Sequence, residues 1–380
     1  MRSNSQLRVL TIAHNAVAAS NRARVEALRQ RTGVELTLLT PPWWFEEGRR
    51  IEAEGGREWR VGRTLMTGNG TRFLFGASLV KAIRAVRPNV IDLFEEPFSL
   101  VALQTLALRG VFAPQAALVF YSAVNIARKW RWPYRAIEQL VLRHADGAHT
   151  PNADAAHILR DKGLAHDRPV CVIPLGVDAH RFDSAEPMPL PQIPRPRIGF
   201  VGRFEPVKGL DVLLEAFGQM TVRTSLVLAG DGSERPEHSA DGIFARPPVA
   251  YDQLPSFLKA MDVLVLPSVT ILPLHREQFG RVLIEAMAAG VPVVGSDSGS
   301  IPEVIGDAGM IVPERDASAL ARALDSLLSQ PDLRESYTQR AYRRVRTRFD
   351  WSVIADQNIR LFGAAIAHRQ GVPDLEAVGA

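Results

Sequence analysis

Two glutamates stand in the segment Arg276–Gly290, which reads REQFGRVLIEAMAAG. Glu277 precedes a Phe-Gly pair, and Glu285 follows eight positions later inside an apolar run. Gly280 can cap a helix that Gly290 then terminates in the left-handed conformation. The free amides at such a helix start bind anionic oxygens, while carboxylates accept hydrogen bonds from pairs of hydroxyl groups. The segment therefore predicts a ligand with phosphate and sugar groups; two solvated acids beside a core helix are the alternative.

A turn after a predicted strand supplies two cations. Residues 199–217 read GFVGRFEPVKGLDVLLEAF, which is typical of a strand, a glycine turn and a helix. Gly202 leaves room for a ligand against the backbone, and Arg203 and Lys208 stand ahead of the helix start. Two cations beside a helix N-terminus suit a diphosphate. An exposed turn with incidental basic residues is the alternative, and the spacing of a Walker loop is absent.

A neighbouring strand also ends in glycines. Residues 226–234 read LVLAGDGSE, with Asp231 between Gly230 and Gly232. The pattern indicates either a turn at the carboxyl edge of a sheet, facing the same ligand, or a plain left-handed turn without a ligand.

Strand and helix patterns alternate along the whole chain, which favours parallel sheets covered by helices. In the first half we expect strands at 7–13, 34–40, 89–94, 116–122, 147–150 and 170–176, and helices at 20–31, 75–86, 98–109, 133–144 and 152–162. In the second half we expect strands at 197–203, 225–231, 263–268 and 292–297, and helices at 209–219, 252–260, 280–289, 301–305, 316–329 and 349–367. This α/β pattern predicts two doubly wound domains, each binding ligands at the carboxyl ends of its strands.

A proline-rich segment separates the two halves. Residues 184–197 read SAEPMPLPQIPRPR and contain five prolines. Proline at this density interrupts both helices and sheet ladders, so we interpret the segment as a linker between domains at 1–185 and 186–349.

The composition of the 380-residue chain is that of a soluble globular protein. Its single cysteine, Cys171, excludes an intramolecular disulfide and suits a reducing compartment. No apolar run approaches the ~18 residues that a membrane span needs, and the first residues show no signal-peptide pattern. We therefore expect a cytoplasmic protein.

Charge is distributed unevenly between the halves. Residues 1–185 hold 25 Lys and Arg against 17 Asp and Glu, and five of the six tryptophans lie there. A basic half rich in tryptophan suggests an anionic acceptor, or peripheral contact with the inner face of the membrane, while ordinary surface decoration is the alternative. No helix-turn-helix, zinc or RNA-recognition pattern supports a nucleic-acid partner.

Several motifs occur together in the order found in one known family. They are VIPLGVD (172–178), FVGRFEPVKG (200–209), AGDG (229–232), LPS (266–268), the E-x7-E pair of Glu277 and Glu285, and GVPVVGSDSGSIPEVIGDAGMIV (290–312). As a set, they resemble the family 4 glycosyltransferases of the GT-B fold. The match covers nearly all of residues 170–355, whereas the first domain matches loosely.

The resemblance implies a fold and roles for the residues. Two Rossmann-like domains would face a deep cleft, with the first binding an acceptor, the second a nucleotide-sugar, and a C-terminal helix at about 350–368 crossing back to the first. Arg203 and Lys208 match the pair that neutralises the donor diphosphate, Glu285 the acid that holds the ribose, and Glu277 the acid beside the transferred sugar. The expected donor-side residues are Gly202, Arg203, Lys208, Gly230, Asp231, Glu277, Phe279, Gly280, Arg281, Val282 and Glu285. Of these, Glu277, Arg203 and Lys208 are the predicted catalytic residues.

The chain departs from the family pattern in three places. The turn after the first strand reads IAHNAVAASN where many members have a Gly-Gly pair, and the strand FYSAVN ends without the family's histidine. Residues 232–254 are short and proline-rich, which leaves recognition of the base open. On the acceptor side we expect His14, Asn15, Glu95, Glu96 and Asn125, and helix capping is the alternative role for the two glutamates.

The resemblance also implies a reaction. A hexose-type sugar would pass from a nucleoside diphosphate, UDP or GDP, to a glycan, lipid-linked or small-molecule acceptor with retention of configuration, in polysaccharide or glycoconjugate biosynthesis. No D-x-D pattern calls for a metal, and no further cofactor is expected. The alternatives are a GT-B nucleotide-sugar epimerase and a non-catalytic sugar-nucleotide-binding partner.

Overall fold

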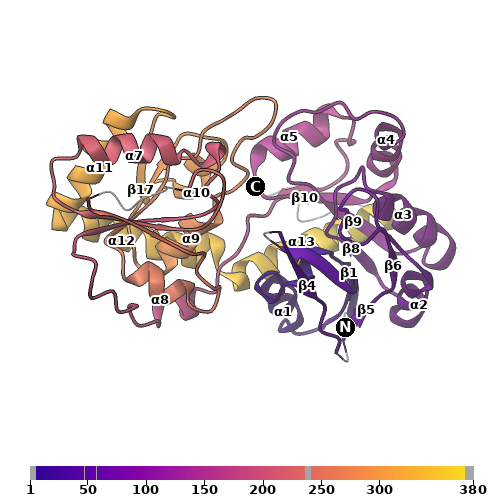
Figure 1. Cartoon of the computed structure of the whole chain (residues 1–380). Coiled ribbons are helices and arrows are strands. Elements are labelled where there is room, and N and C mark those ends of the chain that lie inside the picture. Colours follow the sequence, from indigo (N-terminus) through magenta and orange to yellow (C-terminus); the bar gives the residue numbers. More distant parts are fainter. Residues whose placement is uncertain (1–5, 47, 57, 236–240, 373–380) are drawn as a thin grey trace. The chain divides into compact units, whose positions relative to one another are not determined.

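The structure, a computed structural model, describes residues 6–46, 48–56, 58–235 and 241–372. The chain divides into two compact units: unit 1 comprises Met1–Ile173 with Ile354–Ala380, and unit 2 comprises Pro174–Val353. Each is a parallel sheet flanked by helices, as Figure 1 shows, and this confirms the predicted doubly wound α/β class.

Unit 1 contains a seven-stranded parallel sheet in the order β11-β10-β9-β8-β1-β2-β5. Its strands are β1 (Leu7–Ile12), β2 (Val34–Thr40), β5 (Trp59–Val61), β8 (Val90–Leu93), β9 (Ala117–Tyr121), β10 (Gly147–Thr150) and β11 (Val170–Val172). Two antiparallel ribbons, β3 (Trp43–Glu46) with β4 (Arg49–Glu52) and β6 (Thr64–Leu65) with β7 (Leu74–Phe75), accompany it. The central strands are buried along their length, as expected for a sheet covered on both faces.

The helices of unit 1 follow its strands in sequence. They are two 3-10 turns (Asn15–Val17 and Ala19–Asn21), α1 (Ala23–Arg29), α2 (Ala77–Val86), α3 (Leu100–Phe112), α4 (Tyr134–His144), α5 (Ala153–Asp161) and the C-terminal α13 (Trp351–Gln370). Ser99 and Asn152 cap α3 and α5, because each side-chain oxygen accepts a hydrogen bond from a backbone amide of the first turn.

Unit 2 contains a six-stranded parallel sheet in the order β14-β13-β12-β15-β16-β17. Its strands are β12 (Arg197–Val201), β13 (Ser225–Ala229), β14 (Ile243–Arg246), β15 (Val263–Leu266), β16 (Val293–Ser296) and β17 (Gly309–Val312). Its helices are α6 (Ala179–Asp183), a 3-10 turn (Pro206–Lys208), α7 (Leu210–Gln219), α8 (Leu254–Lys259), α9 (Arg281–Ala288), α10 (Ile301–Ile305), α11 (Ala317–Ser329), α12 (Pro331–Arg344) and a π-helical turn (Val345–Phe349).

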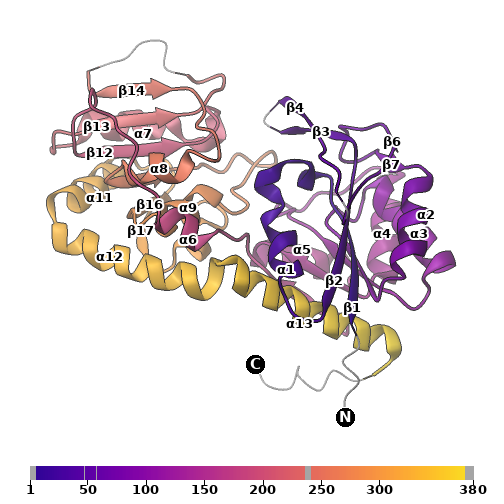
Figure 2. The same cartoon turned by 90° about the horizontal axis from the view of Figure 1, so that it is seen from below.

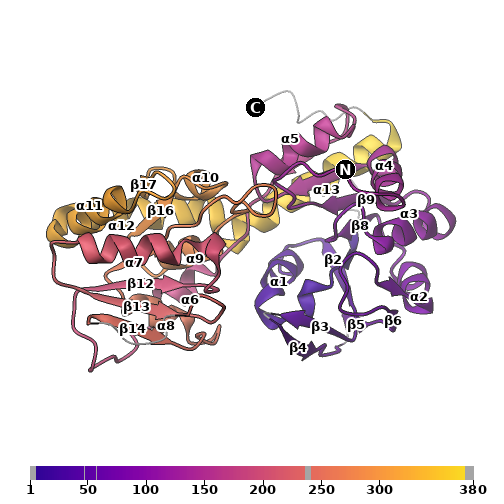
Figure 3. The same cartoon turned by 45° about the horizontal axis from the view of Figure 1, so that its top comes forward.

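The unit 2 sheet separates two apolar cores, because successive side chains of a strand point to opposite faces. In β13, Val227 belongs to one core and its neighbours Leu226 and Leu228 to the other. α7 and α11, which Figure 3 shows together above β12, cover one face, while α6, α8, α9 and α10 pack on the other.

Helix α13 is held to unit 1 by a buried ion pair. Figure 2 shows α13 alongside α1. Arg24 of α1 donates to both carboxylate oxygens of Asp92 in β8, at 2.9 and 3.1 Å, and to Asn358 Oδ1 of α13 at 2.6 Å. Burial opposes ionisation of Asp92, but the Arg24 guanidinium outweighs it and holds the pKa of that carboxyl well below its usual range. Thr11 Oγ1 of β1 also donates to Asp92, so these contacts join four elements: α1, β1, β8 and α13.

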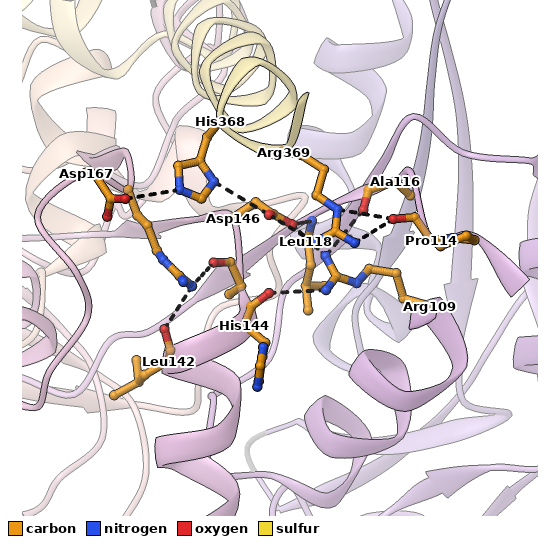
Figure 4. Close-up of polar contacts among 12 residues, drawn as sticks. Arg109, Pro114, Ala116, Leu118, Leu142, His144, Asp146, Asp167, His368 and Arg369 are labelled. Atoms are coloured by element: carbon orange, nitrogen blue, oxygen red, sulfur yellow. Dashed lines mark hydrogen bonds and ion pairs between the residues drawn. The ribbon is translucent and has the colours of Figure 1, made fainter. Parts of the chain in front are cut away.

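The end of α13 is anchored around Asp146, which precedes β10. Figure 4 shows Arg109 donating to Asp146 Oδ2 at 2.6 Å, and the Leu118 amide donates to the same oxygen. Arg369 of α13 donates to the Pro114 carbonyl at 2.6 Å, and His368 lies 3.6 Å from Asp146 Oδ1. The C-terminal helix therefore belongs to unit 1.

The proline-rich segment is packed rather than free. Residues 184–196 form neither helix nor strand, but Leu190 and Ile193 are buried in the core of unit 2. Arg197 Nη2 donates to the carbonyls of both residues, at 2.7 and 2.6 Å. The division between the units lies earlier, between Ile173 and Pro174, because α6 packs on α8 and α9 of unit 2.

Most predicted strands and long helices lie within a few residues of their expected bounds. Elements without a prediction are the ribbons β3–β4 and β6–β7, the strands β5, β14 and β17, and the helices α6 and α12. The strands among them are two to four residues long and only partly buried, so they lack the continuous apolar run that marks the equally short buried strands β8 and β15.

The Arg24–Asp92 pair gives a stability prediction. Asp92→Asn leaves the buried Arg24 charge without its carboxylate, so the free energy of unfolding of unit 1 should fall by about 3 kcal/mol. Tryptophan fluorescence during urea unfolding measures it, since five of the six tryptophans lie in unit 1. The control is Glu52→Gln in the exposed Arg50–Glu52 pair, which should change stability little. An Asp92→Asn effect no larger than the control's would contradict the prediction.

Candidate active site

The strand order of each sheet reverses at one point, where ligands of open α/β sheets bind. In unit 2 the reversal lies between β12 and β15, and in unit 1 between β1 and β8. Arg203 follows β12 and Glu277 follows β15, while His14 follows β1 and Glu95 follows β8. Residues predicted from separate motifs therefore come from the two strands that flank each reversal.

A buried ion pair joins the two sides of the unit 2 reversal. Lys208 Nζ donates to Glu277 Oε2 at 2.6 Å, and Ser268 Oγ donates to the same oxygen at 2.9 Å. Burial favours the neutral form of Glu277, but Lys208 and Ser268 outweigh it, so the pKa of this carboxyl is lowered. Arg203 is more exposed and pairs with Glu205 at 2.8 Å. The site thus presents two cations, each paired with a carboxylate.

Two glycines allow the loops of this site to pack closely. A Cβ on Gly230 would lie 1.9 Å from the Gly202 carbonyl oxygen, so the turns after β12 and β13 can touch only without side chains. Gly299 has φ +54° and its Cβ would lie 2.0 Å from the Glu277 carbonyl oxygen. The Ser300 amide donates to that same oxygen at 3.1 Å. The loop after β16 therefore supports the backbone of Glu277.

Helix α9 carries the second glutamate. Gly280 caps the helix in the left-handed conformation, and Glu285 is buried one turn beyond Arg281, whose Nε lies 3.2 Å from Glu285 Oε1. Burial raises the pKa of Glu285 to about 7, while Arg281 and Arg181 oppose the rise. The pKa values of the two glutamates of the E-x7-E pair are therefore shifted in opposite directions: burial raises that of Glu285, whereas Lys208 and Ser268 lower that of Glu277.

The other predicted donor-side residues take different positions. Phe279 is buried in the core, so only its backbone can meet a ligand. Val282 packs partly buried against that core. Asp231 is exposed, and its side chain accepts a hydrogen bond from the Gly232 amide at 3.0 Å and lies 3.6 Å from Arg235.

Three side chains near this site were not predicted. Arg181 of α6 stacks on Tyr251 with its guanidinium 4.4 Å from the ring centroid, and both lie on the Glu285 side. His275 stands two residues before Glu277. Burial lowers the pKa of His275, and its surroundings include Glu277, Lys208, Arg203 and Glu205. The histidine's proximity to Glu277 in the sequence was the available indication.

At the unit 1 reversal, His14 and Glu95 form a tight pair. The His14 amide donates to Glu95 Oε1 at 2.7 Å, and His14 Nδ1 lies 2.6 Å from Glu95 Oε2. Burial works against protonation of His14, but Glu95 outweighs it and raises the pKa of the imidazole. The ring packs on Trp44, with centroids 4.4 Å apart. Glu95 therefore fixes both the backbone amide and the Nδ1 side of the His14 ring.

The other residues predicted on the acceptor side lie in the segments that follow β1, β8 and β9. Glu96 accepts hydrogen bonds from Ser122 Oγ at 2.7 Å and the Ala123 amide at 2.8 Å, and burial raises its pKa to about 7. Asn15 begins the 3-10 turn after β1, and Asn125 is buried in the loop after β9. Among the described residues, the side chain that caps α3 is that of Ser99 rather than that of Glu95 or Glu96.

The described residues offer neither a cluster of metal ligands nor a helix that could span a membrane. They contain no group of three His, Cys, Asp or Glu side chains arranged to hold a metal ion. Within the same ranges, no helix has both the length and the apolar character that crossing a bilayer requires.

Comparisons with known proteins agree on one family. The model described as "Glycosyltransferase Family 4" matches residues 20–181, and that described as "Glycosyl transferases group 1" matches residues 195–330. The phosphatidyl-myo-inositol mannosyltransferase of Mycobacterium leprae is 37% identical over 206 residues, which cover 50% of this chain and 52% of that protein. The D-inositol 3-phosphate glycosyltransferase of Streptomyces avermitilis is 32% identical over 235 residues, covering 53% and 48%. The chain thus spans about half the length of the curated relatives it matches.

Solved structures share the fold across most of the chain. Sucrose-phosphate synthase from Thermosynechococcus elongatus aligns with a TM-score of 0.68 and 21% identity, covering 95% of this chain and 99% of the other. HepE from Anabaena, solved in complex with UDP and glucose, aligns with a TM-score of 0.64 and 16% identity, covering 94% and 99%.

The raised pKa of Glu285 predicts a stability difference that depends on pH. Its pKa is about 7 in the folded protein against 4.5 ordinarily, so the folded state favours the protonated acid. Stability from this preference is complete below about pH 4.5 and is lost as the pH rises through about 7. Glu285→Gln, which mimics the acid, should match wild type near pH 4.5 and exceed it by about 3 kcal/mol at about pH 8.

Calorimetric unfolding across this pH range measures the difference. Glu186→Gln, which changes an exposed carboxyl of unit 2, is the control and should show no such divergence. Equal stability of wild type and Glu285→Gln at the higher pH would show that the buried carboxylate carries no such cost.

Proposed function

The chain belongs to glycosyltransferase family 4 and has the GT-B fold; from this we propose that it transfers a hexose-type sugar from a nucleoside diphosphate to an acceptor, with retention of configuration. The observation that carries the proposal is the Lys208–Glu277 pair at the strand reversal of unit 2, beside the start of α9. Lys208 supplies a cation for a phosphate, and Glu277, at hydrogen-bond distance from it, supplies a carboxylate for a sugar hydroxyl.

The donor's phosphates would be stabilised by this chain's fixed charges. Transfer breaks the bond between the anomeric carbon and the phosphate oxygen, and the electron pair moves to the leaving diphosphate. Lys208, Arg203 and the amides at the start of α9 would stabilise that charge without moving. This is an electrostatic and positioning task, for which no metal ion or further cofactor is needed.

Glu277 is suited to hold a hydroxyl rather than to attack carbon. Its Oε2 already accepts from Lys208 and Ser268, so it is a poor nucleophile in this state. In the proposed reaction the acceptor hydroxyl attacks from the side on which the diphosphate leaves, and its proton passes to a departing phosphate oxygen. Glu285 on the next turns of α9 would hold the ribose hydroxyls.

The acceptor is proposed to meet unit 1 at His14. Glu95 holds Nδ1 and the amide of this residue, which leaves Nε2 as the group available to an acceptor hydroxyl. Relatives named as acting on phosphatidyl-myo-inositol and inositol 3-phosphate support a lipid-linked or polar acceptor in glycoconjugate biosynthesis. The UDP complex of HepE supports a nucleoside diphosphate donor.

Unit 1 also has a surface suited to an anionic membrane. Trp132 is 84% exposed beside the exposed Lys129 and Arg131. Arg72 donates to Tyr134 at 2.9 Å, which places Arg72 at the start of α4, directly after this loop; the segment 64–75 that contains Arg72 also carries the exposed Leu65 and Met66. We propose that this surface rests on lipid headgroups at the cytoplasmic side, where basic and aromatic side chains bind well.

The donor-site assignment makes a direct prediction. Arg203→Ala and Lys208→Ala should each lower sugar transfer, and donor hydrolysis, by roughly a hundredfold or more, because each removes a charge aimed at the leaving group. A thermal-shift screen against UDP- and GDP-sugars first identifies the donor, since specific binding stabilises the fold. Arg322→Ala, an exposed arginine of α11, is the matched control. Normal rates in both site variants would refute the assignment.

The same assays separate the alternatives. A nucleotide-sugar epimerase would convert the donor sugar without forming an acceptor product. A non-catalytic partner would bind a donor and neither transfer nor hydrolyse it. An anomeric proton signal in the product with the donor's configuration supports retention, and the opposite configuration rejects it.

Binding to vesicles tests the membrane surface. The protein should sediment with vesicles that contain phosphatidylserine, less so at high salt, and Trp132→Ser with Lys129→Ser should lower the bound fraction several-fold. Val111→Ser, which changes an exposed apolar residue elsewhere in unit 1, is the control. Absence of sedimentation at low salt would end this part of the proposal.

A further inference from the structure

We propose that His275 is a third cation of the donor site, created only when the donor binds: its imidazole takes up a proton as the diphosphate enters. The inference rests on the proposed nucleoside diphosphate donor and concerns the same site in unit 2. Donor affinity then depends on pH through His275, which lies outside the motifs that resemble the family.

His275 is held in a fixed place beside the ion pair. Its amide donates to the Ile271 carbonyl at 2.8 Å and its carbonyl accepts from the Ile271 amide at 2.9 Å, so the two residues close a tight hairpin. The hairpin lies between Ser268 and Glu277, which are themselves joined by a hydrogen bond. The backbone therefore leaves the imidazole little freedom to leave the site.

One ring nitrogen of His275 has no hydrogen-bond partner. Nε2 is buried, and no partner for it exists among the residues that the structure describes. A buried polar atom without a partner is unfavourable, so such atoms commonly mark a place that a ligand completes. An anionic oxygen of the donor would supply the missing acceptor once Nε2 carries a proton.

The charges around His275 explain why it is neutral before the donor binds. The groups that act on it are Glu277, Lys208, Arg203 and Glu205. They form two ion pairs, Lys208 with Glu277 and Arg203 with Glu205, whose charges cancel. Burial therefore dominates and lowers the pKa of His275, so that the imidazole carries no charge near neutral pH.

Binding of the diphosphate changes this balance. A nucleotide-sugar brings two negative charges to a site whose existing charges already cancel in pairs. A nearby negative charge favours the protonated form of histidine, so part of the new charge is offset by a proton from solvent. A protonated Nε2 then donates a charge-assisted hydrogen bond, which is stronger than one from a neutral group.

Calorimetry of donor binding tests the inference. The probe is whichever of UDP-glucose and GDP-mannose stabilises the protein in the thermal-shift screen; neither diphosphate titrates near neutral pH. Titrations in buffers of different ionisation enthalpy give the number of protons taken up. Wild type should take up a substantial fraction of a proton near pH 7, and its Kd should weaken by up to about tenfold per pH unit above that.

His275→Gln should remove this uptake and bind the probe with a Kd that is roughly tenfold weaker at about pH 6 and little changed at about pH 8. Any proton exchange from Glu285 is present in both proteins and cancels in the comparison. His166→Gln, an exposed histidine of unit 1, is the matched control and should behave as wild type. Equal proton uptake in wild type and His275→Gln would overturn the inference while leaving the donor proposal intact.

A second measurement uses only the wild-type protein. The NMR titration of the His275 ring proton should shift to higher pH when the probe is bound, and an unchanged titration would overturn the inference. If neither nucleotide-sugar, nor any other in the screen, binds at any pH, the proposed function itself fails. These outcomes distinguish an error about His275 from an error about the donor.

Discussion

A charge buried away from water must be paired, and the pairing of Lys208 with Glu277 organises the proposed donor site of unit 2. The lysine comes from the turn after β12 and the glutamate from the loop after β15, so the ion pair joins the two strands at which the sheet order reverses. Ser268 and the amide of Ser300 hold Glu277 from two further sides. The loops around this ion pair are constrained, because their backbones have to approach it closely, as Gly299 does at Glu277.

The two glutamates of the E-x7-E pair show how environment gives one residue type two properties. Glu277 meets a lysine and is ionised, whereas Glu285 is buried with arginines that only partly offset the loss of water. A buried acid with a pKa of about 7 costs stability in its charged form. Such a cost is typical of sites where ligand hydroxyls, rather than the protein, satisfy the group.

Unit 1 applies a similar principle with different residues. Its strand reversal carries the His14–Glu95 pair, and just below it in the sheet the Arg24–Asp92 pair holds α13 through Asn358. Buried polar contacts thus fix both His14 and the helix that completes the unit. Because each charge has a partner, the unit keeps polar groups inside a sheet whose strands are otherwise apolar.

The sequence alone determined the fold class and the positions of most strands, because hydrophobic periodicity and glycine turns are local properties. It also predicted the residues of the proposed donor site. Short strands such as β5 and β14 were not predicted, because they are only partly buried and lack a continuous apolar run. The segment 184–197 shows the limit of composition: its prolines exclude regular structure, but only packing shows Leu190 and Ile193 inside the core of unit 2. Only the tertiary structure decided which charges meet, namely Lys208 with Glu277, His14 with Glu95, and His275 beside two ion pairs. The physical reason is that the members of each ion pair lie far apart in sequence, and that burial cannot be read from a residue's type. Both pairing and burial depend on how the strands are ordered in the sheet.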